Sequence, residues 1–270
     1  MSNFLPASAL FSFLRHRKLI YQLAKREVIS RYRGSVMGLA WSFFNPLLML
    51  AVYTFVFSVV FNARWGGQAG HRGEFAIILF VGILVHGIFA ECINRAPTLI
   101  TSNSSYVKRV VFPLDTLPWV AMGAALFHAL VSLIVLLVAQ LFIRGVLPAT
   151  VIYLPLVLFP LILFTMGLAW LLAALGVFIR DIGQMTGILT TILLFLAPVF
   201  YPVEALPVQI REWIYINPLT FIIEQSRDVL VWGVNPDLVG LGKYLLFAVF
   251  VALLGYACFQ KMRRGFSDVI

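Results

Sequence analysis

The sequence predicts an all-α integral membrane protein that crosses the bilayer six times. Charged residues make up only 11% of the chain, whereas a soluble domain carries about 25%. The mean hydropathy is +0.97, and apolar runs recur that are long enough for a membrane helix of about 20 residues. Basic residues crowd at the ends of these runs. Lipid is therefore the expected solvent for most of the chain.

Six apolar runs are the expected spans, and in chain order they are residues 36–61, 75–100, 118–143, 151–179, 185–200 and 244–259. A run of 26 residues, such as the first, makes a helix of about 39 Å, which exceeds a hydrocarbon core of roughly 30 Å. Tilted or broken helices are therefore expected. The spans form a membrane domain over residues 36–260, between an N-terminal region (1–35) and a tail (261–270).

The basic residues predict the orientation of the chain. An even number of spans places both termini on one side. That side carries four acids and thirteen basic residues, against six acids and six basic residues on the other side. The thirteen are Arg15, Arg17, Lys18, Lys25, Arg26, Arg31, Arg33, Lys108, Arg109, Arg180, Lys261, Arg263 and Arg264. The positive-inside rule therefore predicts that both termini are cytoplasmic.

Residues 15–33 alternate basic and apolar side chains at helical spacing. One face of a helix would carry the apolar residues Leu19, Ile20, Leu23, Ala24 and Val28. This pattern predicts an amphipathic helix that lies along the inner leaflet. An anchor on the membrane surface, with no further function, is an equally good interpretation.

The stretch NSSYVKRVVFPLDTLPW, residues 103–119, separates the second predicted span from the third. It contains two prolines and the basic pair Lys108 and Arg109. A turn between two spans needs only a few residues. We therefore expect this stretch to contact a partner in water, and the alternative is a plain loop.

Residues 201–242 separate the last two predicted spans on the outer side. Asn217 followed by Pro218 is a favourable helix start. Two short amphipathic helices are expected, near residues 206–216 and 218–232. They would form either an outer gate or an interfacial loop held by aromatic residues.

Motifs of common catalytic sites are missing from the sequence. It contains no G-x-x-x-x-G-K-[ST] phosphate loop, no H-E-x-x-H, no C-x-x-C and no G-x-S-x-G. Four scattered histidines and two cysteines within apolar runs suggest no metal site and no disulfide framework. The net charge of +9 is explained by membrane orientation rather than by nucleic-acid binding. We therefore expect neither an enzyme nor a cofactor in this chain.

A few polar and aromatic residues within the spans are candidates for a channel lining. Glu91 and Arg95 lie four residues apart, so they can pair on one helix face, either to stabilise packing or to line a pore. Tyr53, Phe57 and Phe61 repeat every four residues on the first span. This stripe favours plain helix packing, with contact to sugar rings as the alternative.

Taken together, these motifs resemble the permease subunits of bacterial ABC transporters that export polysaccharides: the O-antigen (Wzm-like), capsule and teichoic-acid exporters. The resemblance covers nearly the whole chain and fits the O-antigen branch best. The matching segments are AKREVISRYRGSVMGLAWSFFNPLLMLAVYTFVFSVVF (residues 24–61), Phe112-Pro113, Leu117-Pro118, Arg180-Asp181, Ala197-Pro198-Val199-Phe200-Tyr201-Pro202 and Asn217-Pro218.

The resemblance implies a function and a set of partners. The chain would form a homodimer in the bacterial inner membrane and bind two copies of a cytoplasmic ATPase, which would hold ATP and Mg. It would export an undecaprenyl-pyrophosphate-linked polysaccharide of the O-antigen type. Capsule or teichoic-acid export and export of a small molecule or lipid are the nearest alternatives. A channel or secondary carrier without an ATPase and a scaffolding protein are more distant ones.

The resemblance also implies roles for particular segments. Residues 103–119 would contain a coupling helix that binds the ATPase, with Ser104, Ser105, Tyr106, Val107, Lys108, Arg109 and Phe112. The interface helix would contact the ATPase as well. Guanidinium groups suit a pyrophosphate, so it would receive the substrate through Arg26, Arg31, Tyr32 and Arg33. The short outer helices would form a periplasmic gate with Phe200, Tyr201, Trp213 and Tyr215.

Overall fold

The structure is a computed structural model that describes residues 7–61, 65, 73–107 and 112–269. These residues form helices and connecting turns, without a β-strand among them. The α-helices are α1 (Ala7–Tyr32), α2 (Trp41–Tyr53), α3 (Glu74–Arg95), α4 (Ser104–Val107), α5 (Leu117–Arg144), α6 (Leu154–Phe178), α7 (Ile182–Leu196), α8 (Val208–Ile214), α9 (Pro218–Arg227), α10 (Leu238–Met262) and α11 (Phe266–Val269). A π-helical segment, η2 (Thr54–Val60), continues α2, and another, η8 (Asp228–Trp232), continues α9.

Within the described residues, five helical segments are long and apolar enough to cross a membrane. They are Gly38–Phe57, Glu74–Thr98, Leu114–Arg144, Ala149–Phe178 and Leu238–Val269. They correspond to the first, second, third, fourth and sixth predicted spans. The fifth predicted span corresponds to α7, an apolar helix of 15 residues, which is about 22 Å long. The last span is longer than predicted, since α10 begins at Leu238.

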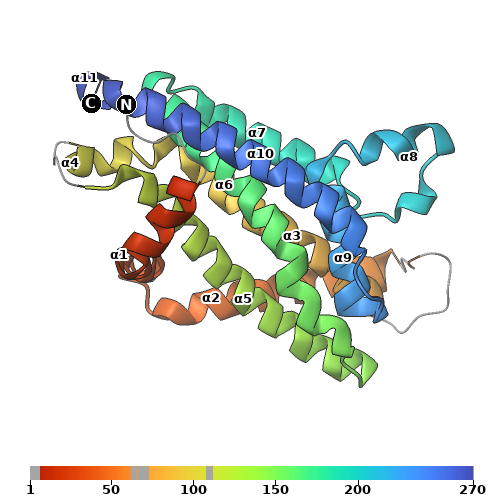
Figure 1. The fold of residues 1–270 in the computed structure, drawn as a ribbon. Helices are drawn as coiled ribbons and strands as arrows, with labels where there is room; N and C mark the ends of the chain where they lie inside the picture. The colour runs from red at the N-terminus through yellow and green to blue at the C-terminus, as the bar shows by residue number, and fades with distance from the viewer. Residues whose placement is uncertain (1–6, 62–64, 66–72, 108–111, 270) are drawn as a thin grey trace.

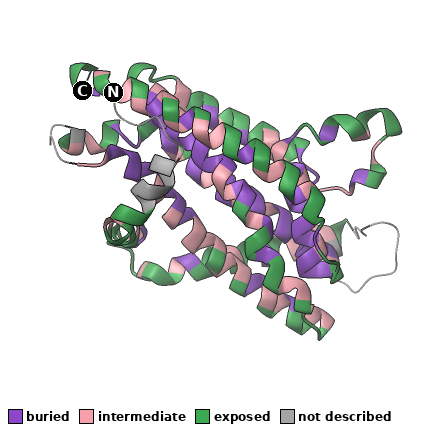
Figure 2. Cartoon of the chain, in the orientation of Figure 1, coloured by how far each residue is buried: buried purple, intermediate pink, exposed green. Residues whose placement is uncertain are grey.

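The long helices form an elongated bundle with distinct ends (Figure 1). Helices α1, α4 and α11 lie at one end, here named the α1 end, and α8 and α9 lie at the other, the α9 end. Helix α3 runs through the centre: 72% of its most apolar window is buried, against 11% for the span that contains α2. Figure 2 shows the same contrast between buried and exposed helices.

Close packing of α6 against α10 depends on glycine. A Cβ atom on Gly167 of α6 would lie 2.6 Å from the carbonyl oxygen of Val251, and one on Gly255 of α10 would overlap the carbonyl of Gly167. Gly34 and Gly38 have positive φ, 87° and 50°, in the connection between α1 and α2, where Gly38 begins a short 3-10 segment (Gly38–Ala40).

Helix α1 presents the predicted apolar face to the bundle. Ile20 and Val28 are buried, whereas Lys18, Gln22 and Lys25 are exposed. The helix packs across α5, where Ala24 lies against Gly123. The helix begins at Ala7, earlier than the amphipathic pattern predicts, and ends at Tyr32.

The two short helices predicted after residue 201 are also present. Helix α8 and the pair α9–η8 correspond to the expected segments. The Asn217 side chain caps α9 by accepting a hydrogen bond of 3.0 Å from the Leu219 N–H, and Pro218 occupies the first position of the helix. The start signal in the sequence is therefore confirmed.

Candidate functional site

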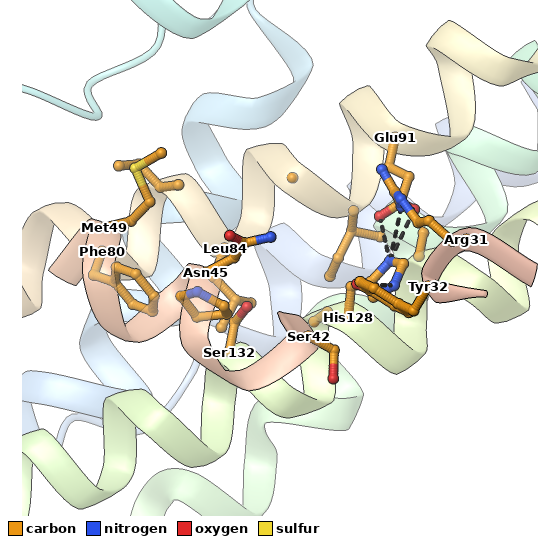
Figure 3. Close-up of a pocket in the computed structure, with 16 residues that line it drawn as sticks. Arg31, Tyr32, Ser42, Asn45, Met49, Phe80, Leu84, Glu91, His128 and Ser132 are labelled. Carbon is orange, nitrogen blue, oxygen red and sulfur yellow. Dashed lines mark hydrogen bonds and ion pairs between the residues drawn. The ribbon is translucent and has the colours of Figure 1, made fainter. Parts of the chain in front are cut away.

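A polar cluster joins the C-terminal end of α1 to α3 and α5 (Figure 3). Arg31 Nη1 donates to Glu91 Oε1 at 2.5 Å. The Nδ1 atom of His128, on α5, lies 2.9 Å from both carboxylate oxygens of Glu91. Tyr32 contacts the other ring nitrogen of His128, with its hydroxyl 3.2 Å from Nε2. Three helices are therefore linked through one carboxylate.

The contacts of His128 favour one assignment of its protons. An ionised carboxylate can accept hydrogen bonds but cannot donate them, so the Nδ1 atom of His128 carries the proton that is donated to Glu91. Nε2 can then accept a hydrogen bond from the Tyr32 hydroxyl. Arg31 Nη1 lies 3.3 Å from Nδ1, but two N–H groups cannot bond to each other, so Glu91 is the acceptor for both donors.

A second ion pair connects the same two helices one turn further along α3. Arg95 pairs with Glu27 of α1. The prediction that Glu91 and Arg95 pair with each other along α3 is therefore wrong. Each of them pairs with a residue of α1, because the polar face of α1 lies opposite that end of α3.

A groove adjoins the polar cluster. It has a volume of about 300 Å³ and lies between α2, α3 and α5. Along α3 it extends from Glu91 to Phe80, which is about 16 Å at 1.5 Å per residue. Figure 3 shows the polar cluster at one end of the groove and Met49 and Phe80 at the other.

A second, wholly apolar cavity of about 370 Å³ lies beside the groove, between α3, α5 and α6. The two share Leu84, Ile88 and Ala129 as lining residues. The groove therefore has a charged end, a mostly apolar remainder that includes Asn45 and Ser132, and an apolar neighbour. This arrangement suits an amphiphilic ligand better than a polar one.

At the α9 end, Arg227 is the principal buried cation. Its side chain is only 4% exposed and donates to the backbone oxygens of Ile78 (3.1 Å), Pro198 (2.6 Å) and Val199 (3.0 Å). The Trp65 ring lies 4.4 Å from the guanidinium carbon, a cation–π contact. Burial lowers the pKa of Arg227 to about 9, so it stays charged at neutral pH. Arg227 thus ties the segment after α7 to α3.

Side chains of neighbouring helices also bind the carbonyl groups of η8. Thr150 donates to Val229 at 2.7 Å, Gln140 donates to Leu230 at 2.7 Å, and Arg144 donates to Val231. Arg144 forms an ion pair with Glu74 at 2.7 Å as well. These bonds satisfy backbone groups that the irregular helix leaves available.

Comparison with known proteins agrees with this architecture. The ABC-2 type transporter family model matches residues 18–231, which include α2 to α9. The chain belongs to this family. It is similar to the O-antigen export system permease protein RfbA of Myxococcus xanthus, with 29% identity over 95% of this chain and 96% of the relative. It is also similar to the polysialic acid transport protein KpsM of Escherichia coli (23% identity, 89% and 92%) and to the capsule polysaccharide export inner-membrane protein CtrC of Neisseria meningitidis serogroup B (26% identity, 92% and 92%).

The segment predicted to bind a partner is connected to α1 in this ABC-2 type transporter. Ser104, Ser105, Tyr106 and Val107 form α4, and the Tyr106 ring stacks on Phe112 with 4.3 Å between ring centroids. Arg26 Nη2 donates to the Tyr106 hydroxyl at 3.0 Å. Lys108 and Arg109 lie outside the described residues.

The four residues predicted to bind phosphate lie in the last part of α1 and just after it, and they make different contacts. Arg31 and Tyr32 belong to the polar cluster, and Arg26 reaches Tyr106 instead. Arg33 follows the helix and is exposed. The sequence pattern did not identify His128, because no spacing rule connects it to α1 or to Glu91.

Two residues of the predicted aromatic stripe, Tyr53 and Phe57, pack against neighbouring segments. Tyr53 is half-buried against the core. Phe57 stacks on Phe75 and on Phe200, with centroid distances of 5.1 and 6.5 Å. Phe61 contacts Phe57 and is 67% exposed. Since Phe57 lies in the π-helical segment η2, the stripe does not follow an α-helical face.

The structure gives separate contacts for the predicted gate residues. Phe200 stacks on Phe195 at 5.5 Å, and the Tyr201 hydroxyl donates to the Phe195 backbone oxygen at 3.1 Å. Trp213 is 70% exposed. Tyr215 donates to Glu224 at 2.9 Å, and partial burial together with this bond raises the pKa of Tyr215 to about 12.

Proposed function

We propose that this chain is the membrane-spanning permease subunit of an ATP-driven polysaccharide exporter of the O-antigen type. The observation that carries the proposal is the similarity to an O-antigen export permease over 95% of this chain and 96% of that relative. Similarity to the capsule export proteins keeps capsule polysaccharide as the alternative cargo, and small-molecule or lipid export is the more distant alternative.

In this proposal, α7 provides a sixth crossing beside the five longer spans. Its length of about 22 Å requires a locally thin bilayer or a broken path. Both α1 and α11 lie at the same end of the bundle (Figure 1), which agrees with an even number of crossings. The excess of basic residues supports a cytoplasmic location for the α1 end. Helices α8 and α9 would then form the periplasmic gate.

The proposed transport cycle begins at α1. An undecaprenyl-pyrophosphate-linked glycan reaches the inner leaflet, and its pyrophosphate meets the arginines at the end of this helix. Two copies of the permease form the path for the glycan. Two copies of a separate ATPase bind at residues 103–112 and drive the movement with ATP. The bond between Arg26 and Tyr106 supports a mechanical connection between this segment and α1.

Deletion of the gene in its host tests the proposed function. Lipid-linked glycan is fractionated between the cell interior and the cell surface, and the deletion strain is complemented with the wild-type gene. We expect full-length glycan to accumulate inside and to disappear from the surface. Unchanged surface glycan would refute polysaccharide export, and an accumulated small molecule or lipid would identify that alternative cargo.

A further inference from the structure

The ion pair of Arg31 and Glu91 lies at the polar end of the groove. We infer that Glu91 occupies the position of a ligand: its carboxylate holds Arg31 until the phosphate of a lipid takes that place, with the apolar chain of the lipid along the groove. The inference rests on the proposed function, in which α1 receives the phosphate of a lipid carrier. It adds that Glu91 competes with the carrier phosphate for Arg31, and that Arg31 leaves Glu91 when the phosphate binds.

Carboxylate and phosphate are interchangeable partners for a guanidinium group. Both are oxyanions that accept parallel N–H hydrogen bonds from arginine. The Arg31 side chain is 54% exposed, whereas that of Glu91 is 17% exposed. A ligand that approaches from outside can therefore reach Arg31, while Glu91 stays within the protein. The exchange needs only a rotation of the Arg31 side chain.

His128 gives Glu91 a second hydrogen-bond partner, which Glu91 needs when Arg31 leaves it. A shielded carboxylate that loses its only partner is strongly destabilising. The Nδ1 atom of His128 lies 2.9 Å from both oxygens of Glu91. Glu91 therefore keeps a hydrogen-bond donor when Arg31 turns to the ligand, and His128 lowers the free-energy cost of the exchange.

The groove supplies the apolar part of the site. Beyond the polar cluster it is lined by Ile83, Leu84, Met49 and Phe80, with the polar side chains of Asn45 and Ser132 among them. Its extent of about 16 Å along α3 accommodates several isoprene or methylene units. Exposed basic residues such as Lys25 add positive charge to the helix that carries Arg31. The charge and shape of the site thus match a phosphate-bearing lipid.

Binding measurements on the purified full chain in lipid nanodiscs test the inference. The probes are farnesyl diphosphate, inorganic pyrophosphate and farnesol. We expect farnesyl diphosphate to bind most tightly, and the substitution Glu91→Gln to strengthen its binding about tenfold, because a charged competitor is removed. Unchanged or weaker binding by this variant overturns the inference. Equal affinity for inorganic pyrophosphate overturns the lipid assignment and identifies a soluble phosphate ligand.

A double substitution tests the role of His128 separately. His128→Ala should weaken binding of farnesyl diphosphate, because Glu91 then has no partner left after the exchange. In the Glu91→Gln background the same change should have no effect, since no carboxylate needs a partner. A loss of affinity in both backgrounds would mean that His128 contacts the phosphate directly, which would overturn its role as the reserve partner.

The control is Glu74→Gln, at the opposite end of α3. It also removes one carboxylate from α3 and releases an arginine, Arg144. We expect unchanged affinity for farnesyl diphosphate, and an increase equal to that of Glu91→Gln would reduce the effect to net charge and overturn the inference. Failure of this inference can be distinguished from failure of the proposed function. The first is measured by these binding constants, and the second by unchanged surface glycan in the deletion strain.

Discussion

The two ends of the bundle use arginine in opposite ways. At the α1 end, Arg31 is half-exposed and pairs with a carboxylate side chain of another helix. At the α9 end, Arg227 is buried and binds three backbone carbonyl groups. A side-chain partner can be exchanged by rotation about side-chain bonds, whereas a carbonyl partner moves only with its chain. The first arrangement permits exchange of partners, and the second fixes the backbone.

The largest expected effect comes from removing the fixed arginine. Arg227→Ala leaves the carbonyls of Ile78, Pro198 and Val199 without their donor and also creates a cavity. We expect a loss of stability of about 3–5 kcal/mol, measured as thermal unfolding of the purified protein in detergent. Arg33→Ala, which removes an exposed arginine, is the control and should change stability by less than about 0.5 kcal/mol. Equal melting temperatures for the two variants would remove the distinction between the ends.

A smaller loss is expected from a neutral residue of the α9 end. Gln140→Leu removes the bond to the Leu230 carbonyl while keeping most of the side-chain volume. The cost should be about 1–3 kcal/mol, because a buried acceptor is left unpaired. The matched control is Gln22→Leu, at an exposed position of α1. If both variants have the same melting temperature, the hydrogen bonds to the η8 carbonyls do not stabilise the α9 end.

The exchangeable pair should contribute less to stability than its short distance suggests. Glu91→Gln weakens the contact with Arg31, but solvent around that half-exposed side chain screens the interaction. A loss of about 1 kcal/mol or less is expected in the same unfolding experiment. A loss as large as that of Arg227→Ala would show that the α1 end is fixed as firmly as the α9 end.

The smallest effect is expected for the connection between α1 and α4. Tyr106→Phe keeps the stacking on Phe112 and removes only the hydroxyl that accepts from Arg26. A double-mutant cycle with Arg26→Gln should give a coupling energy of about 0.5–1 kcal/mol. A coupling energy of zero would show that the segment predicted to bind the ATPase is not connected to α1 through this bond.

The elements of the fold were largely predictable from local patterns. Apolar runs located the five long spans and the shorter α7, and the alternation over residues 15–33 identified the buried face of α1. The pair Asn217–Pro218 marked the start of α9. Each of these features depends on residues that are close in the sequence, where helical period and capping chemistry act directly.

The candidate site was only partly predictable, because its contacts connect distant segments. Spacing on one helix suggested that Glu91 and Arg95 pair, but residues of α1 compete for both. His128 lies 37 positions from Glu91 and 97 from Arg31 in the chain, so no period connects them. In the sequence Arg227 is only one of the six basic residues counted on the outer side, since burial of a single cation depends on tertiary packing.

The glycine contacts between α6 and α10 have a mechanical consequence. Because the backbones touch where Gly255 meets Gly167, these helices cannot slide or rotate past each other without a collision of main-chain atoms. They therefore act as one rigid unit. Such a restraint is missing for α2, which is mostly exposed, and for α1, which is held by exchangeable ion pairs. A rearrangement that opens a path through the protein would therefore leave α6 and α10 in place and displace α1 and α2 relative to them.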